Sequence, residues 1–262
     1  MAELSGKIAL VTGSTSGIGL GVARTLAASG ADIAMTGFGD AAAIEQQRAA
    51  IAAEYGVRCA YVPADLSDPA AAATLVEAAA AAMGQVDILV NNAGIQHVAD
   101  IVDFPPAQWD RVIAINLTAA FRAMQAAIPG MKARGWGRII NVASAHGLVG
   151  SAQKSAYVAA KHGLLGLTKV AALELANDGI TANSICPGWV LTPLVEAQLQ
   201  ARADQQGITV EEAKRVFLAE KQAMHRFSTP ESIGAAAAYL CSAGADTVTG
   251  IALSVDGGWV AH

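Results

Sequence analysis

The sequence of 262 residues predicts an α/β fold, in which one domain is built on a doubly wound parallel sheet of about seven strands. Short apolar runs of strand length alternate along the chain with longer segments in which apolar residues recur every three or four positions. Strands separated by helices of this length pair in parallel, and the helices cover both faces of the sheet. No linker or low-complexity segment divides the chain, so we expect a single domain despite its length.

The expected strands are the apolar runs, because each is short and is followed by glycine or polar residues. They lie at residues 8–11, 33–36, 59–62, 86–90, 138–142, 180–186 and 251–255. The first ends at Thr12-Gly13, and the second ends at Gly37-Phe38-Gly39.

Helical periodicity or a high alanine content marks the segments between the strands. We expect helices at about residues 18–30, 41–55, 68–83, 106–134, 155–177 and 231–242. Asp68 is the expected N-cap of the third helix. Pro129 lies near the end of the fourth helix and is expected to kink or break it there.

Residues 191–227 interrupt this alternation, because they are too long for a simple crossover between the sixth strand and the next helix. We expect two helical stretches in this segment, at 194–204 and 210–223, separated by Gly207. The segment follows the carboxyl end of a strand, which is where open α/β sheets bind ligands. It is therefore predicted to be a substrate lid, and the alternative is a surface excursion without a role.

Composition argues against several classes of protein. Apolar residues make up 53% and charged residues 15%, unlike a disordered chain, and the net charge of −5 without a basic run argues against nucleic-acid binding. Cys59, Cys186 and Cys241 lie far apart, which predicts free thiols in a reducing compartment and no metal site. We recognise neither a leader peptide nor a membrane span, so a cytoplasmic protein is expected.

A glycine-rich turn joins the first strand to the first helix. It reads Thr12-Gly13-Ser14-Thr15-Ser16-Gly17-Ile18-Gly19, with the spacing Gly-x-x-x-Gly-x-Gly. Glycines let the backbone approach a pyrophosphate closely, and the start of a helix offers free N–H groups to an anion. Between a strand and an amphipathic helix, this turn predicts a dinucleotide site rather than a simple tight turn.

Further candidates for the cofactor site follow later strands, at the same edge of the predicted sheet. They are Asp65-Leu66 after the third strand, Asn91-Asn92-Ala93-Gly94 after the fourth and Pro187-Gly188 after the sixth. The second strand ends at Gly37-Phe38-Gly39, which holds no acid, lysine or arginine. A 2′-phosphate needs cationic partners, so this turn favours NAD over NADP.

Tyr157 and Lys161 lie four residues apart on a predicted helix and therefore share one face. A phenol is a poor base at neutral pH, and a nearby ammonium is expected to lower its pKa. Ser144, just beyond the fifth strand, offers a hydroxyl that could bind a carbonyl or alcohol oxygen. Beside a hydride acceptor, these three residues predict a proton shuttle.

The chain resembles the short-chain dehydrogenase/reductase family over about residues 4–259. The motifs that carry the resemblance are the glycine-rich turn, Asn91-Asn92-Ala93-Gly94, Ser144, Tyr157-Val158-Ala159-Ala160-Lys161 and Pro187-Gly188. The resemblance implies a Rossmann-like fold, a homotetramer and a catalytic tetrad of Asn116, Ser144, Tyr157 and Lys161.

The same resemblance implies a role for each member of the tetrad. Tyr157 would be the acid/base, and Ser144 would position the substrate oxygen. Lys161 would bind the nicotinamide ribose and tune Tyr157, while Asn116 would hold a water that links Lys161 to bulk solvent. The cofactor-binding residues expected on these grounds are Gly13, Thr15, Ser16, Gly17, Ile18, Gly19, Phe38, Asp65, Leu66, Asn92, Gly94, Tyr157, Lys161, Pro187, Val190 and Thr192.

A second group of polar residues lies close to the tetrad positions. Burying a carboxylate is costly unless it is paired and hydrogen-bonded. Lys154 offers a charge, and Gln96, His146 and Gln198 offer donors, so together they predict a small carboxylated substrate. Taken singly, each is more often an ordinary polar residue of an exposed loop.

Within the family, the stretches of sequence that contain these polar residues resemble those of bacterial dehydrogenases of short D-3-hydroxy acids. That resemblance implies that Gln96, His146, Lys154 and Gln198 bind the carboxylate, and that Trp189 and Trp259 shape a methyl-sized pocket.

Two alternatives stay open from the sequence. One is a reductase of 3-oxoacyl thioesters that uses NADPH, which would need a cation near Ser16 or Phe38 and an open channel past the lid. The other is a dinucleotide-binding sensor without turnover, which would usually have lost the tyrosine or the lysine.

Overall fold

The computed structural model describes residues 3–68 and 70–261, and within these residues seven parallel strands form one sheet in the order β3-β2-β1-β4-β5-β6-β7. The strands are β1 (Ile8–Val11), β2 (Asp32–Met35), β3 (Cys59–Tyr61), β4 (Ile88–Asn91), β5 (Gly137–Val142), β6 (Ile180–Pro187) and β7 (Ala252–Val255). The strand order reverses between β1 and β4, and ligands bind at such a switch point in doubly wound sheets. The predicted fold class is confirmed.

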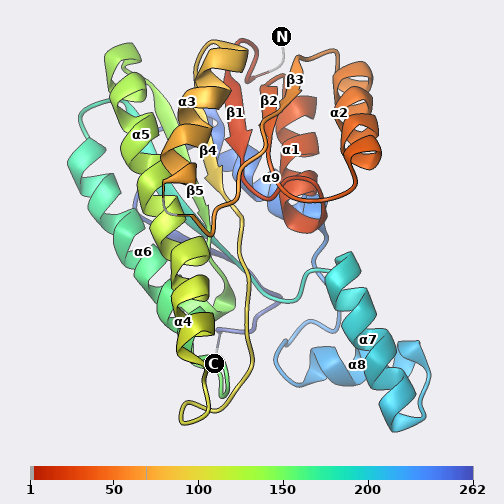
Figure 1. The fold of residues 1–262 in the computed structure, drawn as a ribbon. Helices are drawn as coiled ribbons and strands as arrows, with labels where there is room; N and C mark the ends of the chain where they lie inside the picture. Colours follow the sequence, from red (N-terminus) through yellow and green to blue (C-terminus); the bar gives the residue numbers. More distant parts are fainter. Residues whose placement is uncertain (1–2, 69, 262) are drawn as a thin grey trace.

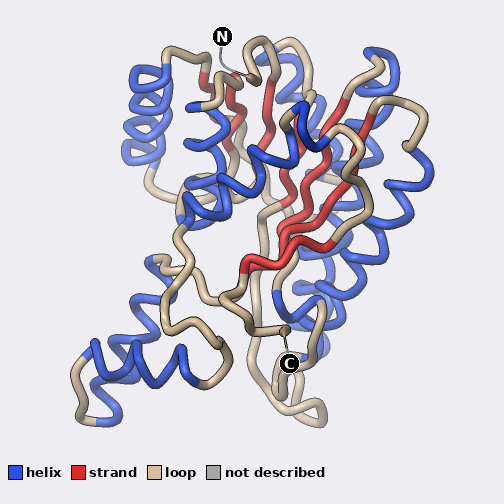
Figure 2. The backbone as a smooth tube through the Cα atoms, turned by 180° about the vertical axis from the view of Figure 1, so that it is seen from behind, coloured by secondary structure: helices blue, strands red, loops and turns tan. Residues whose placement is uncertain are grey.

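Helices cover both faces of the sheet, as Figures 1 and 2 show. The helices are α1 (Gly17–Ala28), α2 (Ala41–Tyr55), α3 (Ala71–Met83), α4 (Pro106–Ile113), α5 (Ala119–Arg134), α6 (Ser155–Leu175), α7 (Pro193–Gln206), α8 (Val210–Ala219) and α9 (Pro230–Cys241). Apolar side chains of α3, α5 and α6 form one core with the sheet, and those of α1, α2 and α9 form another. Because both faces are covered, the strands are continuous apolar runs rather than alternating ones.

A kink or break was predicted at Pro129 in the stretch 106–134, and the prediction of a break at this residue is wrong. Helix α5 runs through Pro129 to its end at Arg134, and the interruption is instead a π-helical turn at Ala114–Thr118. Pro129 and Gln125, whose carbonyl loses its helical partner, are both exposed. Water can therefore replace the missing hydrogen bond, and the helix continues.

The helical stretch Pro106–Arg134 is long and apolar enough to cross a membrane by length and composition. Its apolarity has another explanation, because Met124, Ala127 and Met131 are buried in the core against the sheet. This is the position of a helix in a covered α/β sheet.

Two other predicted ends are wrong, and the rest agree to within two residues. Helix α3 begins at Ala71 rather than Asp68, because the Asp68 carboxylate accepts from the backbone N–H of Ala70 in a turn that precedes the helix. Helix α8 ends at Ala219 rather than residue 223, because the chain turns away to form the contacts around Gln222 described below.

Helices α7 and α8 lie together beyond the carboxyl ends of the strands (Figure 1). They are separated at Gly207, whose φ of 63° is the left-handed conformation that glycine adopts freely. An ion pair between Arg202 and Glu220 joins the two helices. The expected helical segment at 191–227 is therefore present, and its role as a lid stays a prediction.

Candidate active site

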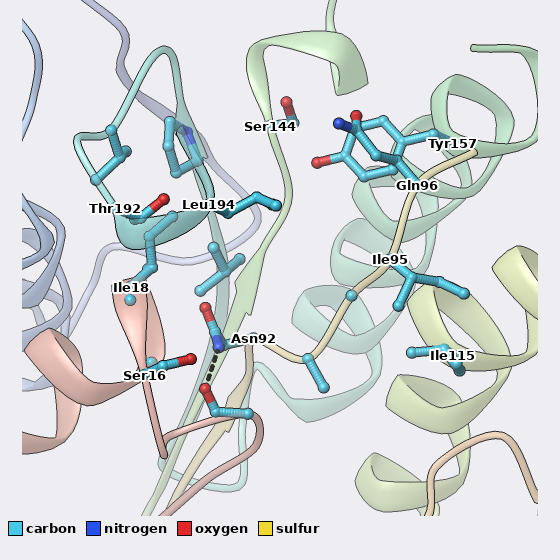
Figure 3. A pocket seen from close by; sticks show the side chains of 18 of the residues that line it. Ser16, Ile18, Asn92, Ile95, Gln96, Ile115, Ser144, Tyr157, Thr192 and Leu194 are labelled. Atoms are coloured by element: carbon cyan, nitrogen blue, oxygen red, sulfur yellow. Dashed lines mark hydrogen bonds between the residues drawn. The ribbon is translucent and has the colours of Figure 1, made fainter. Parts of the chain in front are cut away.

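A cavity of about 630 Å³ lies between the carboxyl edge of the sheet and the helical segment. Figure 3 shows Ser16, Ile18 and Asn92 at one end of it, and Ser144, Tyr157 and Gln96 at the other. Every residue assigned above to cofactor or substrate binding lines this cavity, whereas Asn91, at the start of the candidate motif after β4, does not. Of the predicted tetrad, Ser144, Tyr157 and Lys161 line it, and Asn116 lies just behind its wall.

The glycine-rich turn forms one end of the cavity with its backbone. Gly17 has a φ of 52°, and a Cβ on Gly19 would collide with the carbonyl oxygen of Gly13 and with Nδ2 of Asn92. Asn92 supports the turn, because its Nδ2 donates to the carbonyls of Thr12 (2.8 Å) and Gly13 (3.2 Å). The side chain of the N-cap residue of α1 makes no capping hydrogen bond, and the first residues of the helix line the cavity, so their free N–H groups are available to an anion.

The turn after β2 is held in an unusual conformation by two hydroxyl groups. Gly37 and Gly39 have φ values of 154° and 155°. The Tyr61 hydroxyl donates to the carbonyl of Gly37 (2.7 Å), and Oγ1 of Thr15 donates to the carbonyl of Phe38 (2.8 Å). The Phe38 side chain is 73% exposed and leaves the turn open. The nearby Asp40 caps α2, so its carboxylate does not occupy this turn.

Asp65 and Arg111 lie at the same end of the cavity. The Asp65 carboxylate accepts hydrogen bonds from the backbone and side chain of Ser67, which lower its pKa, and the Arg111 guanidinium lowers it further. Sequence reasoning missed Arg111 of α4 and Ile115 of the π-helical turn, which both line the cavity. Their spacing of four residues is a helical face, but nothing in the sequence shows what that face meets.

The residues present fit a nicotinamide dinucleotide. The cavity contains a backbone cradle that a Cβ at Gly19 would fill, and beside it the hydroxyl Oγ1 of Thr36 is buried with no hydrogen-bond partner among the described residues. Because an unpartnered buried hydroxyl is costly, a ligand or water that accepts from it or donates to it is expected there.

Tyr157 and Lys161 lie on one face of α6, as predicted, and Lys161 is only 3% exposed. The Lys161 ammonium donates to the carbonyl of Val142 (2.8 Å) and lies 5.6 Å from the centre of the Tyr157 ring. Burial lowers the pKa of Lys161 to about 8. Burial also raises the pKa of Tyr157, although a hydrogen bond with Ser144 opposes this change.

The expected lowering of the Tyr157 pKa by Lys161 is therefore wrong for the protein without a cofactor. Desolvation disfavours the phenolate more than the neighbouring hydrogen bond favours it. The ammonium is directed to Val142, so its stabilising effect on the phenolate is weaker than the helical spacing alone suggests.

Asn116 is brought to the site by the π-helical turn. Its Nδ2 donates to the carbonyls of Ile95 (2.8 Å) and Val112 (2.9 Å), while its Oδ1 is buried and has no partner among the described residues. A Cβ on Gly94 would lie 2.5 Å from this oxygen and 3.6 Å from the Lys161 ammonium. The unpartnered oxygen and the ammonium thus flank Gly94, an arrangement that suits a bridging water.

His146, Lys154, Trp189 and Trp259 surround the other end of the cavity. The pKa of His146 is lowered to about 4 by its burial and by the nearby Lys154, so its imidazole is neutral at pH 7. Burial also lowers the pKa of Lys154, whose ammonium lies 5.7 Å from the Trp189 ring. Trp259 packs edge-on against His146, with 5.0 Å between ring centres.

Two residues behind this wall were missed by the sequence analysis. Phe217 of α8 packs against Trp189 with 4.2 Å between ring centres, and Gln222 accepts a hydrogen bond from the backbone of Trp189. Phe217 looks like any apolar residue of an amphipathic helix, and Gln222 looks like a polar residue of a turn. No pattern in the sequence distinguishes them.

The chain is similar in sequence to known proteins over nearly its whole length. A family model described as enoyl-(acyl carrier protein) reductase matches residues 13–260. The chain belongs to the short-chain dehydrogenase/reductase family. Two relatives are named D-beta-hydroxybutyrate dehydrogenase. The one from Cupriavidus necator is 59% identical over 99% of this chain and 100% of its own length, and the one from Rhizobium meliloti is 51% identical over 98% and 99%.

Solved structures of other short-chain dehydrogenases share the fold. One from Agrobacterium tumefaciens, with bound NADP, is 37% identical and gives a TM-score of 0.85 over 99% of this chain and 98% of its own. Another, from Sinorhizobium meliloti, is 36% identical and gives a TM-score of 0.89 over the same shares of the two chains.

Proposed function

We propose that this short-chain dehydrogenase oxidises D-3-hydroxybutyrate to acetoacetate with NAD⁺, in a reversible reaction. The observation that carries the proposal is the partly buried ammonium of Lys154 near the neutral imidazole of His146, at the same end of the cavity as Ser144 and Tyr157. A partly desolvated cation is stabilised by an anionic partner, and a carboxylate that reaches it would place a short hydroxy acid beside the phenol. The names of the two relatives agree with this substrate.

The remaining polar groups at this end complete a site for a carboxylate. Gln96 and Gln198 line the cavity from different segments, one after β4 and the other on α7, and each offers an amide donor. Trp189 and Trp259 both line this end of the cavity and lie 5.2 Å apart between ring centres, so they offer an apolar wall to the methyl group. We therefore assign Gln96, His146, Lys154 and Gln198 to the carboxylate, and the two tryptophans to the methyl group.

The chemistry follows from the groups around the substrate hydroxyl. Bound NAD⁺ would supply the hydride acceptor and a positive charge that favours the phenolate form of Tyr157. Ser144 holds the substrate oxygen, and Tyr157 as phenolate removes the hydroxyl proton while hydride leaves C3. Lys161 passes the proton to solvent through a water that the unpartnered Oδ1 of Asn116 would hold, since the ammonium and this oxygen both lie next to Gly94. Lys154 fixes the carboxylate, so the carbon that loses hydride is oriented before the reaction.

The cofactor assignment rests on the turn after β2. Its carbonyl groups are already engaged by Thr15 and Tyr61, and residues 36–40 contain no lysine or arginine that could pair with a 2′-phosphate. The structure with bound NADP shows that other members of the fold accept a phosphate, so NAD preference is a property to be measured in this chain.

We further infer a homotetramer in a reducing, cytoplasmic compartment. The apolar side chains of Phe121, Val170 and Leu173 are exposed on α5 and α6, and burying them against another copy would stabilise an assembly. Cys59, Cys186 and Cys241 are buried thiols. Light scattering of the purified protein would test the tetramer directly.

The test of function is an assay of NADH absorbance with D-3-hydroxybutyrate and NAD⁺, with NADP⁺ and the L-enantiomer as controls. Rapid NADH formation with the D-acid and NAD⁺ alone is expected. No turnover in this assay, together with reduction of an acetoacetyl thioester by NADPH, would overturn the proposal in favour of the thioester reductase.

A further inference from the structure

Trp189 is connected to the segment that follows α8 through both polar groups of its backbone. Its N–H donates to Oε1 of Gln222 (2.7 Å), and its carbonyl accepts from the N–H of Ser228 (3.0 Å). Val190 and Ser228 form a parallel bridge beside these bonds. The wall of the substrate cavity and the end of the helical segment are therefore one connected unit.

Gln222 is the buried centre of this unit. It is 4% exposed, and its Nε2 donates to the carbonyls of Arg226 (3.1 Å) and Met224 (3.4 Å). Both ends of the amide are thus satisfied within the chain, which is what a buried amide requires.

Two glycines leave room for the Gln222 amide. A Cβ on Gly188 would lie 2.9 Å from Oε1 of Gln222, and a Cβ on Gly257 would lie 2.6 Å from Nε2. Gly257 also has a φ of 61° and accepts a hydrogen bond from the backbone N–H of Met224. The amide therefore joins three segments that are far apart in sequence: the turn after β6, the end of the helical segment and the turn after β7.

The Trp189 indole has no hydrogen bond of its own to fix it. Its Nε1 is buried without a partner among the described residues, and the ring packs between Phe217 (4.2 Å) and Trp259 (5.2 Å). Packing between rings tolerates sliding and rotation more readily than a directional hydrogen bond does. The direction of the indole therefore depends on where the backbone of Trp189 is held.

We propose that Gln222 is a positioning residue that fixes Trp189 and so sets the width of the cavity next to the methyl group of the substrate. The inference rests on the proposed function for the identity of that substrate. Gln222 also transmits the position of α8 to the cavity wall, since Phe217 of α8 packs on the indole whose backbone Gln222 holds.

The test compares Gln222→Met with Gln222→Glu and with a matched control. Gln222→Met keeps the approximate volume and removes both the acceptor and the donors. Gln222→Glu keeps an acceptor oxygen for the Trp189 N–H. Gln200→Met makes the same chemical change on the exposed face of α7, where the Gln200 amide donates to Asp204.

Two readouts are needed. The first is steady-state kinetics, with KM for D-3-hydroxybutyrate, for its one-carbon-longer homologue D-3-hydroxypentanoate and for NAD⁺. The second is the ¹⁹F NMR spectrum of protein labelled with 5-fluorotryptophan, in which Trp189→Phe identifies the Trp189 signal. The spectrum does not depend on turnover.

For Gln222→Met, we expect KM for D-3-hydroxybutyrate to rise about three- to tenfold, as expected for one lost hydrogen bond. The preference over the longer acid should shrink, KM for NAD⁺ should stay within about twofold, and the Trp189 signal should shift or broaden. Gln222→Glu should show a smaller change in each, and Gln200→Met should show none.

The proposal is overturned if the Trp189 signal and both substrate KM values are unchanged in Gln222→Met. It is also overturned if only kcat falls, because a merely structural role lowers the active fraction and leaves KM alone. If Gln222→Met does not fold, the same comparisons with Gln222→Glu decide. If the wild-type protein does not oxidise D-3-hydroxybutyrate, the proposed function fails, and the ¹⁹F spectra still show whether Gln222 holds Trp189.

Discussion

The two ends of the cavity differ in whether backbone or side-chain groups line them. The cofactor end is mainly backbone: the glycine-rich turn, the start of α1 and the turn after β2 present N–H groups, carbonyls and bare Cα atoms. The substrate end is mainly side chains, in which a lysine, a histidine, two glutamines and two tryptophans come from five separate segments of the chain.

This difference predicts how amino-acid substitutions affect each end of the cavity. A backbone cradle depends on local spacing, and so one motif of eight residues, 12–19, specifies most of it. A side-chain cradle depends on how distant segments are packed, so its electrostatics and its shape change with single residues. Substitutions at the substrate end should therefore leave cofactor binding intact, and the predictions below test that separation.

The largest effect is expected for Tyr157→Phe. Removing the acid/base should lower kcat by about a thousandfold, within the range for general acid–base catalysis. Affinity for NADH, measured by fluorescence titration, should change by less than about twofold, since one hydrogen bond contributes little. Tyr239→Phe, on the half-exposed face of α9, is the matched control. Retained turnover would reject the role of Tyr157, and lost NADH binding would reject the separation of the two ends.

The next effect is expected for Lys154→Met. A charge-assisted hydrogen bond in a buried site contributes about 2–3 kcal/mol, so KM for D-3-hydroxybutyrate should rise by about a hundredfold, with kcat less affected. Lys221→Met removes an exposed ammonium near the same site, and its smaller effect should disappear at high salt. An unchanged KM in Lys154→Met would exclude the ammonium from carboxylate binding.

A third prediction concerns stability and pH at the substrate end. His146 has a folded pKa of about 4, against an ordinary value of 6.5. Between these values the unfolded chain binds the proton and the folded chain does not, so stability is lost as the pH falls from 6.5 toward 4. Relative to His146→Gln, which does not titrate, the wild-type protein should lose about 2 kcal/mol of unfolding free energy between pH 7.5 and pH 4.5.

Urea unfolding of both proteins at the two pH values measures this change, and other groups that titrate cancel in the difference. A difference that stays constant would mean that folding does not lower the pKa of His146. The imidazole would then become a second cation beside Lys154 below about pH 6.5 rather than staying a neutral donor.

The same contrast explains what the sequence could predict. The strands, the glycine-rich turn and the shared face of Tyr157 and Lys161 follow from local spacing, and all are present in the structure. The position of the helix interruption does not follow from local spacing. The π-helical turn depends on hydrogen bonds from Asn116 to Ile95 and Val112, and Ile95 is distant in sequence. Proline alone suggested a different position.

The pKa shifts of the site could not be predicted from the sequence either. The raised pKa of Tyr157 comes from burial, which the spacing of two residues on a helix does not show. Phe217 and Gln222 act on Trp189 only after the chain has folded back from α8, so no local pattern marks them. The sequence motifs thus identified the residues of the cavity better than they described its chemistry.

The smallest effect, and the sharpest test of the backbone end, is expected for Tyr61→Phe. The Tyr61 ring does not line the cavity, but its hydroxyl donates to the carbonyl of Gly37 and helps hold the turn where the adenosine ribose is expected. Losing one hydrogen bond of this kind should raise KM for NAD⁺ by about threefold. KM for D-3-hydroxybutyrate, measured in the same assays at saturating NAD⁺, is the internal control and should not change. If both KM values rise together, the two ends are coupled through the sheet, and the cofactor end is less independent of the substrate end than its backbone construction implies.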